Sequence, residues 1–189
     1  GVWHLKDKPI RYLTDAEEQK ILRELDPSQI KSRTHRAARQ SARDVFIVMI
    51  DAGFRINEAS TLKWSDIDFE DGVIYLYRTK VGNDDFIPMT QRLRITMENR
   101  RKAVDGEYFF PGRFGGFKSI KNNRALEAAF KRAGLELSSH NLRKTFATRL
   151  LSHAAAITDV QHLLGCVFHA IRPPKPRSSG QWFHDHPAT

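Results

Sequence analysis

The chain has 189 residues and a mass of 21.7 kDa, which predicts one domain of roughly 100–200 residues with room for a tail. Hydrophobic residues make up 40% and charged residues 28%, so a wholly disordered chain is excluded. No apolar run approaches the ~20 residues that cross a bilayer, and the N-terminus lacks the apolar core of a signal peptide. We therefore expect a cytoplasmic protein with no membrane partner.

The net charge indicates a polyanionic partner. Lys and Arg number 31 against 22 Asp and Glu, a formal charge of +9. Such an excess attracts phosphate polymers, and nucleic acid is the expected partner, with a merely solvated basic surface as the alternative. Cys166 is the single cysteine, so no internal disulfide can form. No Cys/His spacing resembles a zinc site, and we assign no metal and no cofactor.

Two helices are predicted first. Thr14 and Glu17 have the spacing of a capping box, which predicts a helix to about Leu25. A longer helix is predicted from about Thr34, turning apolar toward its end and stopping at Gly53. The first half of this helix is basic and could be a solvated face or a phosphate-facing one. The candidate DNA-binding residues are Lys31, Arg33, Arg36, Arg39 and Lys144.

A hairpin is predicted in the middle of the chain. It follows a short helix over Ile56–Leu62. Val73–Tyr77 is β-branched and aromatic, and Phe86–Met89 pairs with it across a turn over Val81–Asp85. Lys80 lies at the tip of this hairpin.

The second half is predicted to be mainly helical. A short buried segment at Tyr108–Phe110 interrupts it. Helices are expected over about Gln91–Val104, Lys118–Ala133, Ser139–Ser152 and Thr158–Leu164. The fold class expected is α+β, mainly α, with a small antiparallel sheet.

Two helix starts carry arginines suited to phosphate. His140 and Arg143 are three residues apart, so they share a helix face near the positive helix N-terminus. The planar fork of arginine bonds two phosphate oxygens at once. Arg55 precedes the short helix at Ile56. A His-x-x-Arg pair alone is usually an ordinary surface pair.

The ordered combination of four segments resembles a known family. The resemblance covers about residues 14–165 and is to the catalytic domain of tyrosine recombinases, or phage integrases. The segments are Gly53-Phe54-Arg55-Ile56-Asn57-Glu58, Thr79-Lys80-Val81-Gly82, His140-Asn141-Leu142-Arg143-Lys144-Thr145-Phe146-Ala147-Thr148 and Val160-Gln161-His162-Leu163-Leu164-Gly165.

The resemblance implies a role for each matching residue. Arg55 and Arg143 would hold the scissile phosphate and stabilise its pentacovalent transition state. Lys80 would protonate the leaving 5′ oxygen, and His140 would bind phosphate and carry a proton. Glu58 would orient the first arginine or the histidine. Double-stranded DNA is the implied partner, cut and rejoined without metal or nucleotide through a 3′-phosphotyrosyl bond, and a tetramer on paired sites is the implied assembly.

This chain departs from the family pattern at its nucleophile. Cys166 stands where the family has histidine or tryptophan, and no tyrosine follows it. The four tyrosines lie upstream of His140, in segments predicted as strand or core: Tyr12, Tyr75, Tyr77 and Tyr108. Cys166 is better explained as a small apolar residue than as a replacement nucleophile. We expect the chain to bind DNA without cutting it in cis. There are two alternatives. The chain could be a half-site partner that uses a tyrosine supplied in trans by another protomer, or a DNA-binding remnant with no catalytic role.

The predicted domain boundaries follow from these boxes. Residues 1–166 are expected to be the catalytic domain, without the core-binding domain that usually precedes it. Residues 167–189 are rich in Pro, Ser, Gly and His and predict an irregular tail, which would weaken assembly. Ala170 to Pro174 can be encoded so that a one-nucleotide shift specifies arginine, tyrosine, alanine and histidine, similar to the nucleophile box. Three origins of the tail stay open from the sequence: a native tail, a decayed one or a frame-shifted one.

Overall fold

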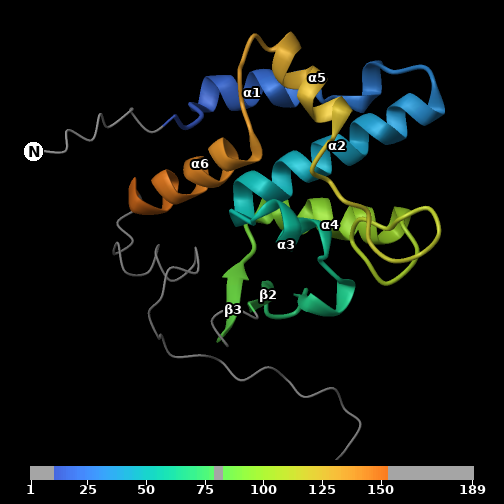
Figure 1. The fold of residues 1–189 in the computed structure, drawn as a ribbon, viewed down its shortest axis with the longest axis vertical. Helices are drawn as coiled ribbons and strands as arrows, with labels where there is room; N and C mark the ends of the chain where they lie inside the picture. The colour runs from blue at the N-terminus through green and yellow to red at the C-terminus, as the bar shows by residue number, and fades with distance from the viewer. Residues whose placement is uncertain (1–10, 79–82, 153–189) are drawn as a thin grey trace, which may run out of the picture.

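Helices dominate the computed structural model, which describes residues 11–78 and 83–152 (Figure 1). Two short 3₁₀ turns, η1 (Pro27–Gln29) and η2 (Trp64–Asp66), join larger elements. The helices of the described part are α1 (Asp15–Glu24), α2 (Arg33–Ala52), α3 (Ile56–Ser60), α4 (Gln91–Ala103), α5 (Arg124–Arg132) and α6 (Ser139–Ser152). The strands are β1 (Ile67–Asp68), β2 (Val73–Arg78) and β3 (Asn83–Pro88).

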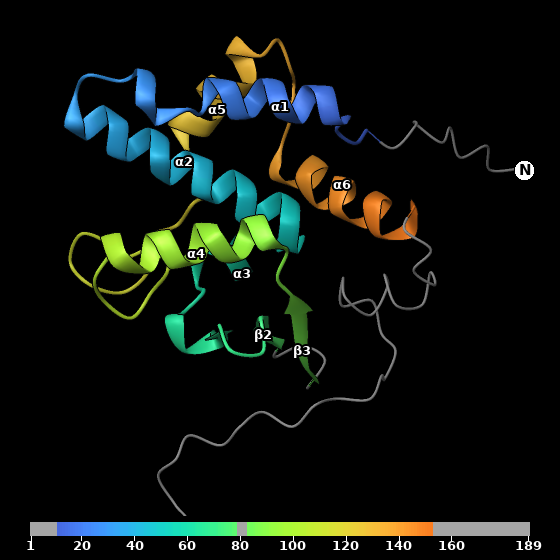
Figure 2. The same ribbon diagram turned by 180° about the vertical axis from the view of Figure 1, so that it is seen from behind.

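Helix α2 is the centre of the fold. Helices α4, α5 and α6 all pack against it, and α1 lies beside α5 (Figures 1 and 2). Every residue from Asp44 to Ala52 is buried, whereas the start of α2 is exposed. The predicted change from a basic to an apolar half is confirmed, because only the second half is surrounded by other helices.

The sheet is antiparallel, with strand order β1-β2-β3. Ile74 pairs with Ile67 on one side and with Ile87 on the other, and all three side chains are buried. The sheet follows α3 and η2 in the chain and lies below α3 in the view of Figure 1.

Local signals placed several helix ends correctly. The capping box is present, with Thr14 and Glu17 bonding each other's backbone N–H groups. Gly53 ends α2 in the left-handed region at φ 62°, which glycine adopts without a Cβ clash. The predicted span of Ser139–Ser152 is that of α6.

Other predictions were wrong. The helix expected from Lys118 begins only at Arg124, because Ile120 is buried and its N–H donates to Ser60 Oγ at 3.1 Å. Residues 83–85, predicted as turn, belong to β3 because β2 continues far enough to pair with them. Strand β1 was missed. Tyr12 is 46% exposed and lies before α1, in neither strand nor core. The predicted helix at Thr158–Leu164 and the tail from 167 lie outside the described residues.

The start of α1 gives a prediction on pH. Hydrogen bonds from the Arg11 guanidinium, then from the Thr14 backbone, lower the pKa of Glu17 to about 2. Its stabilising effect is therefore fully present above its ordinary pKa, about 4.5, and is lost as pH falls through about 2. Glu17→Gln is expected to lower the free energy of unfolding by about 1 kcal/mol at pH 7, because solvent screens this surface pair.

Urea unfolding of Glu17→Gln and the parent chain at pH 7 and near pH 2 measures this effect. The difference between the two chains should shrink at the lower pH, since Glu17 is then protonated in the unfolded state and about half protonated in the folded state. In a chain that also carries Arg11→Gln, the difference at pH 7 should be smaller. An equal difference at both pH values would contradict the prediction.

Candidate functional site

Glu58 binds Arg55 at the start of α3 through both backbone and side chain. Arg55 is the N-cap residue, and its backbone N–H donates to Glu58 Oε2 at 2.7 Å. The Arg55 guanidinium donates from Nη1 to Glu58 Oε1 at 3.0 Å. The Arg55 side chain is 50% exposed and that of Glu58 only 16%. One carboxylate therefore caps the helix and holds a guanidinium that faces solvent.

Arg143 reaches the same carboxylate from α6. Its Nη1 lies 3.9 Å from Glu58 Oε2 and donates to the carbonyl oxygen of Gly53. The Arg143 side chain is 13% exposed. The structure thus brings Arg55 and Arg143 together at Glu58, although the two arginines come from distant parts of the chain.

Close packing at Gly53 places α6 against the end of α2. A Cβ atom on Gly53 would lie 2.2 Å from Cδ1 of Phe146, so only glycine fits beneath this ring. Thr145 is buried, and its hydroxyl accepts the N–H of Leu13 at 2.9 Å and donates to the carbonyl of Asn141. Two contacts next to Arg143 therefore fix α6: Phe146 packs on Gly53, and Thr145 bonds to Leu13.

The other predicted site residues are placed as follows. His140 is exposed in the first turn of α6, and Lys144 is half-buried on the same helix. Lys80 and Cys166 lie outside the described residues.

The basic residues around the start of α2 lie apart from the arginine pair. A helix rises 1.5 Å per residue, so Arg33 is roughly 28 Å along the axis from the end of α2. The Arg36 Nε donates to the carbonyl of Ile30 at 2.9 Å, and Arg39 is half-buried. Lys31, Arg33 and Arg36 are exposed. Any DNA contact at these residues is a second surface, distinct from the site at Glu58.

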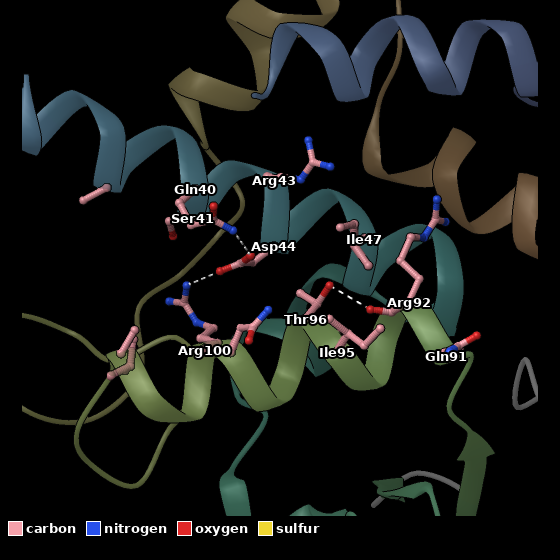
Figure 3. Close-up of a pocket in the computed structure, with 14 residues that line it drawn as sticks. Gln40, Ser41, Arg43, Asp44, Ile47, Gln91, Arg92, Ile95, Thr96 and Arg100 are labelled. Atoms are coloured by element: carbon pink, nitrogen blue, oxygen red, sulfur yellow. Dashed lines mark hydrogen bonds and ion pairs between the residues drawn. The ribbon is translucent and has the colours of Figure 1, made fainter. Parts of the chain in front are cut away.

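A pocket of about 900 Å³ lies between α2 and α4 (Figure 3). Gln40 and Arg100 both donate to the Asp44 carboxylate at 2.7 Å. Burial raises the pKa of Asp44, and the Arg100 charge opposes that rise only in part. Neither Arg55 nor Arg143 lines this pocket. Its central ion pair is already satisfied, so we place the candidate phosphate site at the arginine pair instead.

Sequence reasoning missed one participant in the site, the carbonyl of Gly53. The motif pointed to Gly53 as a helix terminator, whereas the structure adds its carbonyl as an acceptor for Arg143. A backbone acceptor has no residue-type signal, so only the packing of α6 reveals it.

Comparison with solved structures shows that the fold is shared with tyrosine recombinases. A crystal structure of XerA recombinase matches with a TM-score of 0.66 and 23% identity, over 82% of this chain and 55% of that one. A lambda integrase dimer bound to a COC′ core site matches with a TM-score of 0.62 and 23% identity, over 87% of this chain and 63% of that one. The expected α+β, mainly α, fold class is confirmed.

The phage integrase family model matches residues 11–168, so the chain belongs to that family. Tyrosine recombinase XerA of Pyrococcus furiosus is 29% identical over 165 residues, which cover 81% of this chain and 52% of that protein. Tyrosine recombinase XerC of Chromobacterium violaceum is 27% identical over 173 residues, or 85% of this chain and 58% of that protein. The chain spans about half the length of the curated relatives it matches. Within residues 11–78 and 83–152, no helix is long and apolar enough to cross a membrane.

Proposed function

We propose that this chain is the DNA strand-breaking and rejoining part of a site-specific recombinase, and that Arg55 and Arg143 hold the scissile phosphate. The observation that carries the proposal is the convergence of two guanidinium groups, from α3 and α6, on the single carboxylate of Glu58. Membership of the phage integrase family supports double-stranded DNA as the substrate.

The geometry suits a phosphoryl transition state. One carboxylate faces two guanidinium groups, so this trio carries a net positive charge. Guanidinium forks set in place before the reaction stabilise the negative charge that develops on the phosphate oxygens. His140, three residues before Arg143, lies on the same helix, and its role as a phosphate ligand and proton carrier rests on the family resemblance. The role of Lys80 as the proton donor to the leaving oxygen rests on the family resemblance.

The nucleophile is the missing part of this proposal. No tyrosine follows Tyr108 in the sequence, so no hydroxyl of that type stands after the His140 box. We propose that this chain binds the scissile phosphate and does not cut in cis, because only the covalent step needs the tyrosine. A homo-oligomer on paired sites, with a tyrosine lent by another protomer, is the assembly in which its arginines would act.

Complementation in trans tests the proposal. This chain is mixed with a tyrosine-bearing relative whose own two arginines are replaced, on a duplex carrying the relative's site. Covalent protein–DNA product on a denaturing gel is expected only from the mixture. Arg143→Ala in this chain should lower the yield at least 10²-fold, because a transition-state donor is lost. Arg143→Lys should give a yield between those of the parent chain and Arg143→Ala, since lysine keeps the positive charge and lacks the planar guanidinium.

Arg94→Ala is the matched control. It removes an exposed arginine that pairs with Glu98 within α4, away from Glu58, and should leave the product yield within twofold. The proposal is wrong if this chain alone forms the adduct, or if Arg143→Ala complements as well as the parent chain while melting at the same temperature.

A further inference from the structure

A basic loop joins the region after α4 to the start of α5. We use this name for residues 111–124, which Figure 1 shows in yellow beyond the end of α4. The loop contains four basic residues and no acidic one. All four are exposed: Arg113, Lys118, Lys121 and Arg124. A segment with this charge attracts a polyanion and repels a second basic surface.

The tip of the basic loop presents an aromatic ring to solvent. Phe114 is 93% exposed, far more than any other large apolar side chain of the described residues. The guanidinium of Arg113 lies 5.4 Å from the centre of this ring. Removing this ring from water on binding would be favourable, in proportion to the apolar area buried.

The loop holds this ring on a hydrogen-bonded base. The Lys118 N–H donates to the carbonyl of Phe110 at 2.7 Å, and the Gly112 N–H donates to that of Gly116 at 3.0 Å. A Cβ atom on Gly112 would lie 2.9 Å from the Gly115 carbonyl, so the turn is too tight for a side chain there. The backbone that carries the ring is therefore already arranged before binding, which lowers the ordering cost.

The basic loop is also anchored at the end of α3 opposite to Arg55. Its Ile120 N–H donates to Ser60 Oγ, and Ser60 ends the helix that Arg55 begins. Helix α3 adds about 8 Å between Arg55 and Ser60, and six residues from Ile120 to Phe114 span at most about 20 Å. With about 7 Å more for the hydrogen-bonded step from Ser60 to Ile120, Phe114 lies within about 35 Å of Arg55, or about ten base-pair steps at 3.4 Å each.

We propose that the basic loop is a second DNA contact and that Phe114 inserts as an apolar wedge at a base step of the duplex flanking the scissile phosphate. This inference rests on the proposed function. The four cations bind the phosphates on either side, while the ring opens a base step and contacts the exposed base faces. Arg113 adds its charge next to the ring, where both the phosphates and the bases are in reach.

Phe114→Ala tests the wedge. The probe is a random-sequence duplex of about 20 base pairs, labelled at both ends, so that affinity and end-to-end distance are measured together. Phe114→Ala should weaken binding about tenfold, because stacking on bases is lost, and should straighten the DNA. The dependence of affinity on salt should not change, because no charge is removed, whereas Lys121→Ala should lower the salt slope by about one.

The control is Ile95→Ala, which removes an apolar side chain, 49% exposed, from the pocket between α2 and α4. It should leave affinity and bend within twofold of the parent chain. If the parent chain binds DNA but Phe114→Ala changes neither affinity nor bend, the inference is wrong while the proposed function stands. If the parent chain binds no DNA, the proposed function itself fails.

Sedimentation without DNA supplies the second measurement. An unchanged self-association of Phe114→Ala supports the inference. A loss of self-association with unchanged DNA binding would assign the ring to a contact between copies of this chain, and would overturn it.

Discussion

Replacing Arg92 with alanine is expected to lower the free energy of unfolding by about 3 kcal/mol. Arg92, on α4, donates from Nε to Asp51 Oδ2 at 2.9 Å, and its two terminal nitrogens contact Glu18 and Asp51. The carboxylates of Glu18 and Asp51 are only 5% and 6% exposed. Truncation would leave Asp51 a buried charge with the Thr90 hydroxyl, which donates to Asp51 Oδ2 at 2.8 Å.

The size of this effect is limited by two features. The Arg92 side chain is itself 36% exposed, so water can enter its place and rehydrate the carboxylates in part. Glu18 also keeps Arg149, whose Nη2 lies 2.5 Å from its Oε2. We therefore expect the lower end of the range for breaking a buried ion pair, which is about 3–5 kcal/mol.

Urea unfolding at pH 7 measures this loss, with Arg94→Ala as control. Arg94 is two residues along the same helix and pairs with Glu98, and both side chains are more than 40% exposed. Its loss should change stability by less than about 0.5 kcal/mol. Combining Arg92→Met with Asp51→Asn should recover part of the stability, since no unpaired charge then remains on Asp51. Equal losses for Arg92→Ala and Arg94→Ala would show that the buried carboxylates do not need Arg92.

Sequence patterns predicted those features of the fold that local chemistry decides. The box at Thr14 and Glu17 and the glycine at Gly53 act within one helix turn, so their residue types were sufficient. The late start of α5 was not predictable in this way. Its cause is the buried Ile120, whose N–H bonds to Ser60, sixty residues away in the chain. Tertiary packing overrides helix propensity at such positions.

In the candidate site too, the residues could be predicted from the sequence and their contacts could not. The motif order singled out Arg55, Glu58 and Arg143, and the structure brings these three together. Their mutual contacts could not be predicted from spacing, because they depend on how α6 packs on the end of α2. The Gly53 carbonyl and Arg143 are separated by 90 residues, and only the fold makes them partners.

The packing at Gly53 predicts the second large effect. Gly53→Ala is expected to lower the free energy of unfolding by about 3 kcal/mol and to displace Arg143. Part of the loss, roughly 1 kcal/mol, comes from placing an L-residue at φ 62°. The rest, about 2 kcal/mol, comes from overpacking, because the new Cβ would lie 2.2 Å from a ring carbon of the buried Phe146.

Gly72→Ala separates these two causes. Gly72 has φ 67°, nearly the same backbone conformation, but a Cβ there would meet only the Arg94 guanidinium at 3.8 Å. Gly72→Ala should therefore cost about 1 kcal/mol in urea unfolding, the conformational part alone. Equal losses for the two variants would show that the close approach of Phe146 to Gly53 does not limit the fold.

Relief of the overlap completes the test. Adding Phe146→Ala to Gly53→Ala removes the three ring carbons that the new Cβ would strike, so the double variant should be more stable than the sum of the two single losses predicts. Because Arg143 bonds the Gly53 carbonyl beneath this ring, yield in the trans complementation assay should recover with stability. Recovery of stability without recovery of yield would show that Arg143 is positioned by contacts other than those at Gly53.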